Sequence, residues 1–162
     1  SPDESGSTFE ENSKIKAKYF AKKSNLIAIS DDSGLIIDLL SGAPGIYSSR
    51  WAGPTNDFNV AIEKIYNELK KIKFKWSKRK EIVARFISCL TLHWPNGKFI
   101  SSTGIVEGRI SEIKKGTNGF GYDPIFIPSG YEKTFGELNP QEKIKIDHRS
   151  KAFLKISNLF IN

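Results

Sequence analysis

Two adjacent carboxylates, Asp31 and Asp32, stand between two apolar runs of the sequence. Removing a carboxylate from water is costly unless it meets a cation, a hydrogen-bond donor or a metal ion. Ser33 and Gly34 follow, and a glycine lets the backbone turn sharply or lets a ligand approach it closely. The pattern is typical of a site where oxygen ligands hold Mg²⁺ against a polyphosphate. It is equally compatible with an Asp-Asp-Ser-Gly turn that joins two strands.

Three further clusters carry side chains suited to phosphate or metal chemistry. Glu11, Asn12 and Lys16 belong to a predicted helix, on which Asn12 and Lys16 are one turn apart and share a face. A glycine-rich segment covers 119–123, and a charged segment covers 142–149. Each cluster has a structural alternative, because Glu11 has the spacing of a capping box and glycines permit tight loops. A lone lysine or histidine most often serves solubility or structure, so no single cluster establishes a site.

The elements around the first two clusters follow from capping and hydrophobic spacing. A capping box at 8–11 predicts a helix to about residue 22, with Phe9, Ala17 and Phe20 facing inward. Two buried strands are then expected, at 26–30 and 35–40. This arrangement places the adjacent carboxylates at the junction between the two strands.

The remaining elements complete an α/β pattern. Apolar residues recur at helical spacing over 58–72, with Asp57 or Thr55 available as a cap. A Pro-Asn-Gly turn between the apolar runs 81–94 and 98–110 predicts a β-hairpin. The rest is expected as a glycine-rich loop over 114–123, a short strand over 124–127, mostly loop over 128–147, and a helix from His148 that buries Phe153, Ile156 and Phe160. Helices mixed with strands predict an α/β sheet protein.

Composition limits the class of protein. No apolar stretch approaches the ~20 residues of a membrane span, and Cys89 is the only cysteine, so no internal disulfide is possible. Both features predict a cytoplasmic protein. The net charge of +7 is concentrated in seven cations over 70–80, interleaved with Phe74 and Trp76. Such a segment can bind nucleic acid, but without a nucleic-acid motif a solvated helix end is favoured. Neither a membrane nor a nucleic acid is therefore an expected partner.

Taken together, the polar clusters resemble those of the inosine/xanthosine triphosphate pyrophosphatases. The matching motifs stand in the family's order and near its spacing: Thr8 to Ala17, Asp31 to Leu35, Gly42 to Gly53, Phe120 to Phe126, Gly130 to Phe135, Glu142-Lys143, and His148 to Ala152. The resemblance runs from about Glu4 to the C-terminus. It implies an elongated mixed β-sheet flanked by helices, with two lobes around a substrate cleft. It also implies hydrolysis of ITP, dITP and XTP to the monophosphate and pyrophosphate, with Mg²⁺ as cofactor, by a homodimer.

The same resemblance assigns roles to residues of the motifs. Asp32 is implied as the general base and Lys16 as a second catalytic residue that meets phosphate charge. Glu11 and Asp32 are implied as metal ligands, and Asp31 is expected to support the turn or the outer shell of the metal. The implied substrate contacts are Ser33, Phe120, Gly121, Tyr122, Asp123, Lys143, His148 and Arg149.

Recognition of the purine is expected from rings and donors in these motifs. Phe120 or Tyr122 offers a ring to stack on the base. His148 and Arg149 can donate hydrogen bonds to a 6-keto oxygen, where adenine carries an amino group instead. A site that leaves its donors unpaired against the wrong base discriminates strongly.

Two departures from the family pattern carry expectations of their own. The family opens with a loop of the form Thr/Ser-x-Asn-x-Gly-Lys that holds the triphosphate, and no such motif precedes Glu4. We therefore expect 1–162 to form a single domain of this type that is N-terminally incomplete, lacking its first strand and helix. The alternative is a catalytically impaired remnant that keeps the fold. Asp147 stands where the family usually has serine, and its carboxylate adds charge near the nucleotide or holds His148 or Arg149 by a charge-assisted hydrogen bond.

Overall fold

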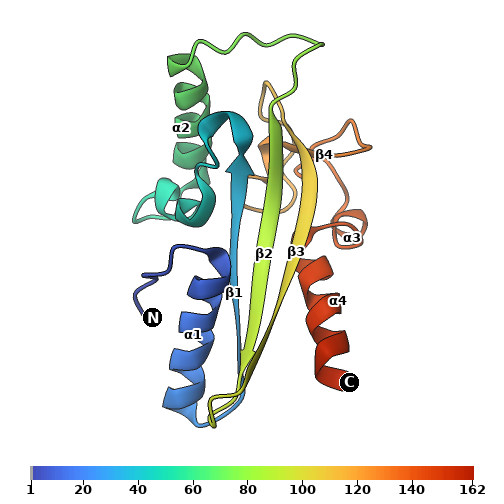
Figure 1. Ribbon diagram of the computed structural model, residues 1–162. Coiled ribbons are helices and arrows are strands. Elements are labelled where there is room, and N and C mark those ends of the chain that lie inside the picture. The colour runs from blue at the N-terminus through green and yellow to red at the C-terminus, as the bar shows by residue number, and fades with distance from the viewer. Residues whose placement is uncertain (1) are drawn as a thin grey trace. The chain divides into compact units, whose positions relative to one another are not determined.

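A four-stranded antiparallel sheet forms the framework of the protein, in the order β1-β2-β3-β4 (Figure 1). The computed structural model describes residues 2–162. The strands are β1 (Ala28–Ile37), β2 (Val83–His93), β3 (Phe99–Ile110) and β4 (Phe126–Pro128). The helices are α1 (Phe9–Ser24), α2 (Phe58–Lys71), α3 (Pro140–Lys143) and α4 (His148–Ile161). The predicted mixed α/β sheet flanked by helices is confirmed. Within residues 2–162, no helix has the length and apolar character needed to cross a bilayer.

Contacts within the chain define two compact units. The first unit contains the residues up to Ser33, together with Ile87–Ile105 and Asp147–Asn162. The second contains Gly34–Phe86 and Val106–Ile146. The three long strands each contribute residues to both units. The single domain expected for the whole chain stays a prediction.

The strand β1 is continuous from Ala28 to Ile37. The expected strand–turn–strand arrangement, with Asp31 and Asp32 at a turn, is therefore wrong. Successive side chains of a strand point to opposite faces, so two neighbouring acids fit within a strand when each face offers them donors. The expected second strand also ends early, because residues 38–40 form a 3₁₀ helix.

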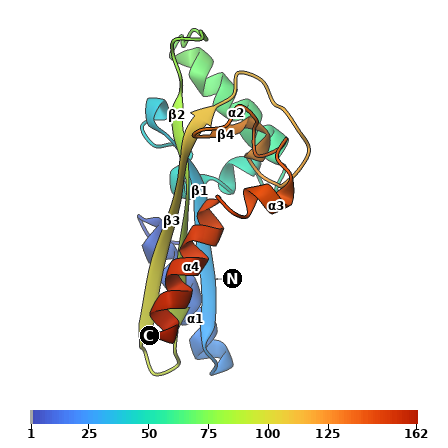
Figure 2. The ribbon, with the colours of Figure 1, turned by 90° about the vertical axis from the view of Figure 1, so that its right-hand side faces the viewer.

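In the first unit, α1 and α4 cover opposite faces of the sheet (Figures 1 and 2). On one face, the Ser13 hydroxyl of α1 donates to Thr91 Oγ1 of β2 at 2.9 Å. On the other, the Ser102 hydroxyl of β3 donates to the Ala152 carbonyl of α4 at 2.6 Å. Hydroxyl donors of this kind fix each helix to the sheet at a defined register, which determines what faces the polar residues of β1.

Small side chains make the closest contacts between these helices and the sheet. Ala17 and Ala152 are fully buried, and a Cβ added at Gly104 would lie 2.0 Å from the carbonyl oxygen of His148. Of the side chains expected inside, Phe9, Ala17 and Ile156 are buried as predicted. The expected burial of three aromatic residues is wrong, because Phe20, Phe153 and Phe160 are 44%, 59% and 55% exposed. The small residues lie against the sheet and leave these rings on the outer face.

Local signals for helix starts and for the hairpin are confirmed. Thr8 is the N-cap of α1, and Asp57 rather than Thr55 is the N-cap of α2. The hairpin between β2 and β3 closes at the predicted turn, where Trp94 donates from its backbone N–H to the carbonyl of Lys98 at 2.8 Å. These features depend on neighbouring residues only, and for that reason they are visible in the sequence.

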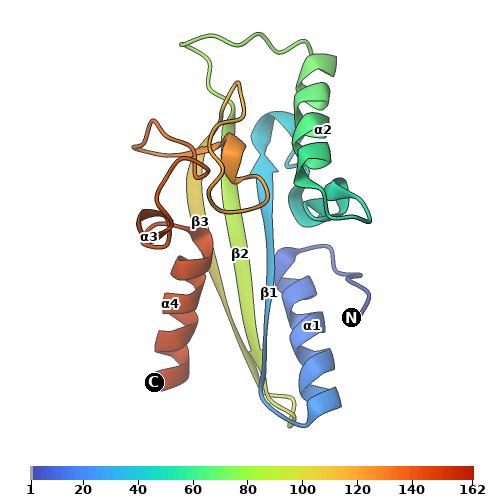
Figure 3. The same cartoon turned by 180° about the vertical axis from the view of Figure 1, so that it is seen from behind.

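The second unit is built around a hydrophobic core. α2 contributes Ile62, Ile65 and Leu69 to it, and α2 also packs against a 3₁₀ helix at Arg50–Ala52 (Figure 3). Complete burial of an aliphatic or aromatic side chain stabilises the folded chain by roughly 1.5–3 kcal/mol. The fully buried members with the largest side chains are Leu35, Ile37, Ile65, Ile82, Ile125, Phe126 and Phe135. This core supports the 114–138 segment, which carries four of the predicted site residues, Phe120, Gly121, Tyr122 and Asp123.

Candidate functional site

A buried ion-pair cluster lies between α1 and β1 in the first unit. Lys16 Nζ lies 2.9 Å from Asp32 Oδ1 and 2.8 Å from Glu4 Oε1. The side chain of Asp32 is 9% exposed and that of Lys16 is 16% exposed. The register is fixed nearby, because the Ser30 hydroxyl of β1 donates to the Ser13 carbonyl of α1. The structure thus brings the two predicted catalytic residues into direct contact.

Burial and neighbouring charges shift the pKa values of Asp32 and Lys16 in opposite directions. Burial raises the pKa of Asp32, and the hydrogen bond and attraction of Lys16 offset only part of that rise. Burial lowers the pKa of Lys16, but the hydrogen bonds and charges of Asp32 and Glu4 outweigh it, and the pKa ends above its ordinary value. Lys16 is therefore a firmly held cation, while Asp32 binds a proton more tightly than an exposed aspartate does.

The second oxygen of Asp32 has no hydrogen-bond partner in the part of the chain that the structure describes. Asp32 Oδ2 is buried and accepts no hydrogen bond from residues 2–162. Asn12 Nδ2 is likewise buried without a partner in the described chain, although the Asn12 amide lies close enough to lower the pKa of Asp32. A buried acceptor left unsatisfied costs roughly 1–3 kcal/mol. Asp32 Oδ2 is therefore the oxygen through which this cluster can bind a proton, a water molecule or a cation.

The donor set fits a magnesium ion shared with a bound ligand. Mg²⁺ prefers oxygen ligands, keeps several waters, and is usually held by one or two carboxylates together with substrate phosphates. Asp32 Oδ2 suits such a role. Within residues 2–162, no three His, Cys, Asp or Glu side chains are grouped to hold a metal ion. The arrangement is thus unlike an all-protein metal cage.

Glu11, the second predicted metal ligand, has its carboxylate on the N-terminus of α1. Its Oε2 accepts from the backbone N–H of Ser7 at 2.7 Å and from the Ser7 hydroxyl at 2.8 Å. The same two bonds, the backbone one more than the hydroxyl, lower the pKa of Glu11. Glu11 would have to exchange these partners to bind a metal ion, so its ligand role stays a prediction.

Asp31 points to the opposite face of β1 and gathers a different set of donors. Asp31 Oδ1 accepts from the hydroxyls of Ser33 at 2.5 Å and Ser88 at 2.7 Å. Asp31 Oδ2 accepts from Arg149 Nε at 3.1 Å. The expected place of Asp31 in a turn is wrong, and two predicted substrate contacts, Ser33 and Arg149, are bonded to this carboxylate.

The start of α4 presents His148 and Arg149 beside each other. His148 is 2% exposed, and Arg149 Nη1 lies 3.5 Å from His148 Nε2. Asp147 is the N-cap of the helix and accepts from the backbone N–H of Ser150 at 2.8 Å. The carboxylate that the structure pairs with Arg149 is therefore Asp31, and Asp147 performs the capping that a serine at this position also provides.

The second unit holds the other predicted substrate contacts. Asp123 Oδ2 lies 2.6 Å from Lys143 Nζ and accepts from the backbone N–H of Phe120 at 2.9 Å. Lys143 Nζ also lies 4.9 Å from the centre of the Phe120 ring. The Phe120 side chain is 60% exposed. Asp123 and Lys143 thus form a buried support beneath an exposed ring, which has the geometry of a stacking surface.

Gly121 and Tyr122 shape this loop from within. Gly121 has a φ of +64°, a conformation that favours glycine. Tyr122 is 3% exposed, its hydroxyl donates to the Ser48 carbonyl at 2.7 Å, and burial raises its pKa. Its ring packs edge-on against Phe58, with centroids 5.2 Å apart. Of the two rings predicted to stack on a base, Phe120 is the exposed one, while Tyr122 belongs to the core.

The predicted site residues therefore form two groups. The first unit holds Glu11, Lys16 and Asp32 on the α1 side of the sheet and Ser33, His148 and Arg149 on the α4 side, and the second unit holds Phe120, Gly121, Tyr122, Asp123 and Lys143. Sequence reasoning missed Glu4 and Ser88. Ser88 carries a detectable signal, because a hydroxyl at a fully buried strand position needs a partner. Glu4 lies ahead of the helix and carries no such signal.

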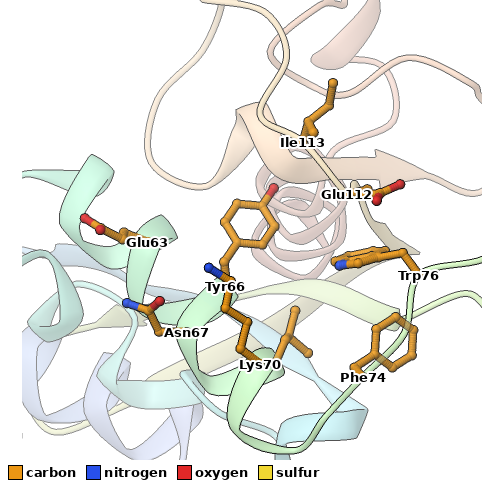
Figure 4. Close-up of a pocket in the computed structure, with 9 residues that line it drawn as sticks. Glu63, Tyr66, Asn67, Lys70, Phe74, Trp76, Glu112 and Ile113 are labelled. Carbon is orange, nitrogen blue, oxygen red and sulfur yellow. The ribbon is translucent and has the colours of Figure 1, made fainter.

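A pocket of about 420 Å³ lies elsewhere in the second unit (Figure 4). Tyr66, Phe74 and Trp76 line it, with Glu63 and Glu112 among the polar residues. Burial raises the pKa of Tyr66 to about 12, and its hydroxyl donates to the Ser111 carbonyl at 2.9 Å. None of the predicted site residues lines this pocket. Phe74 and Trp76 of the basic segment are partly buried and pack against the core of the second unit. They therefore do not form an open stacking surface.

The sequence is similar to those of known proteins over nearly its whole length. The sequence pattern of the Ham1 family matches residues 1–159. The chain belongs to the Ham1 family. A dITP/XTP pyrophosphatase of Agrobacterium fabrum is 47% identical over 95% of this chain and 76% of its own length. A second protein of that name, from Caulobacter vibrioides, is 44% identical over 96% of this chain and 77% of its own length.

Solved Ham1 structures share the fold. A HAM1 protein from Coxiella burnetii superposes with a TM-score of 0.90 at 38% identity, covering 99% of this chain and 80% of that one. The Ham1 protein of Staphylococcus aureus gives a TM-score of 0.87 at 37% identity, with the same coverage. The resemblance inferred from the motifs is thus confirmed at the level of sequence and of fold.

Proposed function

We propose that this Ham1 protein hydrolyses non-standard purine nucleoside triphosphates, ITP, dITP and XTP, to the monophosphate and pyrophosphate. Two relatives named dITP/XTP pyrophosphatases, 47% and 44% identical, support the substrate class. The single observation that carries the proposal is Asp32, a buried carboxylate of raised pKa with one oxygen that accepts nothing from residues 2–162. That oxygen is available to accept a proton, a water molecule or a cation.

In the proposed mechanism, the Asp32 carboxylate orients a water molecule for attack on the α-phosphorus and accepts its proton. A carboxylate with a raised pKa is a stronger base than an exposed one, which suits proton removal near neutral pH. Lys16 has three N–H donors, and Glu4 and Asp32 take two of them. The remaining donor and the positive charge stabilise negative charge that builds up on phosphate oxygens. Asp32 and Lys16 are the proposed catalytic residues.

We propose Mg²⁺ as the cofactor, held by Asp32 and, after exchange of its Ser7 contacts, by Glu11. A bound Mg²⁺ would neutralise phosphate charge and favour departure of pyrophosphate. Asp32 Oδ2 is the better supported ligand of the two, since it is buried and accepts no hydrogen bond from the described chain. Glu11 is exposed and bonded to Ser7.

Substrate recognition is proposed separately for the two units. In the first, His148 and Arg149 donate to the 6-keto oxygen, and Ser33 lies on the same face of β1 as the Arg149 contact. In the second, the exposed Phe120 ring offers a stacking face, which Lys143 and Asp123 support from beneath. Gly121 and Tyr122 shape the backbone that presents this ring. We further propose that the chain forms one catalytic domain, assembles as a homodimer and acts in the cytoplasm.

The decisive test is the identity of the products. The chain is incubated with ITP, XTP or ATP, with and without Mg²⁺, in water enriched in ¹⁸O. We expect equal amounts of pyrophosphate and monophosphate, faster from ITP and XTP than from ATP, and only with Mg²⁺. Attack at the α-phosphorus places the ¹⁸O in the monophosphate.

Three outcomes would contradict the proposal. Release of orthophosphate means attack at the terminal phosphate, and ¹⁸O in pyrophosphate means attack at the β-phosphorus. Binding of ITP without any pyrophosphate release favours the alternative expected from the sequence, an impaired protein that keeps the fold. The mass of the particle in solution, measured by sedimentation, tests the homodimer independently.

A further inference from the structure

The adjacent acids Asp31 and Asp32 serve different helices. Because β1 is a continuous strand, their side chains lie on opposite faces of the sheet. Asp32 bonds to Lys16 of α1, and Asp31 bonds to Arg149 of α4. The two carboxylates are therefore not a joint metal site, and Asp31 has no part in the chemistry proposed for Asp32.

The Asp31 carboxylate is itself fixed by two hydroxyls. Ser33, two residues further along β1, and Ser88 on β2 both donate to Oδ1, at 2.5 Å and 2.7 Å. These donors come from the sheet and set the plane of the carboxylate. Oδ2 is then directed at Arg149 Nε, 3.1 Å away. The sheet thus dictates the orientation of an arginine on α4.

This bond contributes little to the stability of the fold. The side chain of Asp31 is 32% exposed and that of Arg149 is 40% exposed. Ion pairs as exposed as this typically stabilise a protein by about 0–1 kcal/mol. The consequence of the bond is geometric, because a contact through Nε restricts rotation of the planar guanidinium about its last side-chain bond.

We propose that Asp31 is a positioning residue that determines base selectivity by orienting Arg149. The inference rests on the proposed function, in which Arg149 donates to the 6-keto oxygen of the purine. Asp31 itself touches no substrate. A fixed guanidinium meets a keto oxygen with a well-aligned donor, whereas a 6-amino group leaves that donor unpaired. If Arg149 rotates freely, the advantage of the keto base shrinks.

The test is Asp31→Asn, which keeps the size of the side chain and removes its charge. We expect kcat/KM for ITP to fall roughly 10- to 100-fold, almost entirely through a higher KM. The rate for ATP should change little, so the ITP-to-ATP ratio falls with it. The matched control is Asp38→Asn, because Asp38 Oδ2 lies 3.1 Å from Arg85 Nη2 in an equally exposed pair outside the proposed site. This control should leave both substrates unaffected.

A double-mutant cycle shows whether Asp31 acts through Arg149. In an Arg149→Gln background, the further loss of ITP selectivity caused by Asp31→Asn should vanish. If Asp31→Asn instead lowers kcat/KM equally for ITP and ATP, or if its effect persists in that background, the proposal is overturned.

A spectroscopic measurement separates this inference from the proposed function. The Nε–H resonance of Arg149, assigned by its absence in Arg149→Gln, should shift and exchange faster with water in Asp31→Asn. An unchanged resonance overturns the positioning role even in an active enzyme. A wild-type chain that fails to hydrolyse ITP overturns the proposed function, while a shifted resonance in that chain would still support the orientation of Arg149 by Asp31.

Discussion

Two buried carboxylate–lysine pairs, one in each unit, are alike in geometry and differ in how their oxygens are used. Asp32 lies 2.9 Å from Lys16, and Asp123 lies 2.6 Å from Lys143. Asp123 Oδ2 accepts from Lys143 and also from the backbone N–H of Phe120. The carboxylate therefore links the 120–123 loop to α3. Asp32 has an oxygen that accepts no hydrogen bond from residues 2–162. Burial and pairing alone therefore do not distinguish a reactive carboxylate from a structural one.

The backbone around Asp123 also differs from the backbone around Asp32. Gly119 has a φ of +71°, and a Cβ there would lie 2.0 Å from Asp123 Oδ2, so the loop is folded tightly around that carboxylate. Asp32 instead projects from the middle of β1, and no loop of the described chain is folded around its carboxylate in the way that 119–123 is folded around Asp123. A loop wrapped around a carboxylate uses its acceptors for folding. Asp32, on the strand, keeps one oxygen as an acceptor for a ligand.

The largest effect that this comparison predicts is loss of turnover in Asp32→Asn. An amide cannot accept a proton from water at neutral pH, so we expect kcat for pyrophosphate release from ITP to fall by roughly 10²- to 10⁴-fold. The far-ultraviolet circular dichroism spectrum should stay that of the wild type. Asp57→Asn is the control, because asparagine caps a helix as well as aspartate does and turnover should not change. Turnover in Asp32→Asn within a few-fold of wild type would show that Asp32 is not the general base.

The next effect is on stability and concerns the second pair. Lys143→Met leaves the Asp123 carboxylate buried without its cation, and we expect the free energy of unfolding to fall by roughly 3–5 kcal/mol. Urea denaturation measures the loss. Lys71→Met is a matched control, because Lys71 lies 2.6 Å from Glu68, the same distance as in the buried pair, but its side chain is 70% exposed. That variant should lose less than about 1 kcal/mol. Equal losses in the two variants would show that Asp123 is not structural.

A subtler effect concerns the proton affinity of Asp32 in the metal-free protein. The charge of Lys16 lowers the pKa of Asp32 and that of Glu4 raises it, while burial keeps the pKa above its ordinary value. Lys16→Gln should therefore raise the pKa of Asp32 further, and Glu4→Gln should lower it. Titration of the Asp32 carboxyl carbon by NMR, without Mg²⁺, measures both shifts. Shifts of the same sign in the two variants would show that Asp32 does not respond to these charges.

Sequence periodicity and turn signals predicted much of the framework, because those features are local. The caps at Thr8 and Asp57 and the hairpin after β2 are examples. The prediction of a turn at 31–34 is wrong, because this segment belongs to β1. The reason is physical. Aspartate, serine and glycine are typical of turns and depleted in strands, but in the folded chain donors on both faces of the sheet satisfy the two acids. Strand propensity cannot reveal partners that only the tertiary structure supplies.

The candidate site was predictable where its residues share an element or a motif. Asn12 and Lys16 share a helix face, and Asp32 follows from the resemblance to a known family. The contacts of Asp31 were not predictable in this way, because Ser88 and Arg149 lie 57 and 118 positions away along the chain. The contacts of Ser88 and Arg149 with Asp31 depend on the register of β2 against β1 and on the packing of α4. Neither can be recognised from neighbouring residues in the sequence.

The smallest effect concerns Asp147, which the comparison groups with Asp123 rather than with Asp32. Its Oδ1 accepts from the Ser150 backbone N–H at the start of α4. Asp147→Ala should therefore reduce the free energy of unfolding by about 1 kcal/mol, whereas Asp147→Ser, which restores the residue usual in the family, should stay within a few tenths. Urea denaturation of both variants measures this. If serine loses as much as alanine, the negative charge of Asp147 matters in itself, and a bond to His148 or Arg149 becomes the better account of this carboxylate.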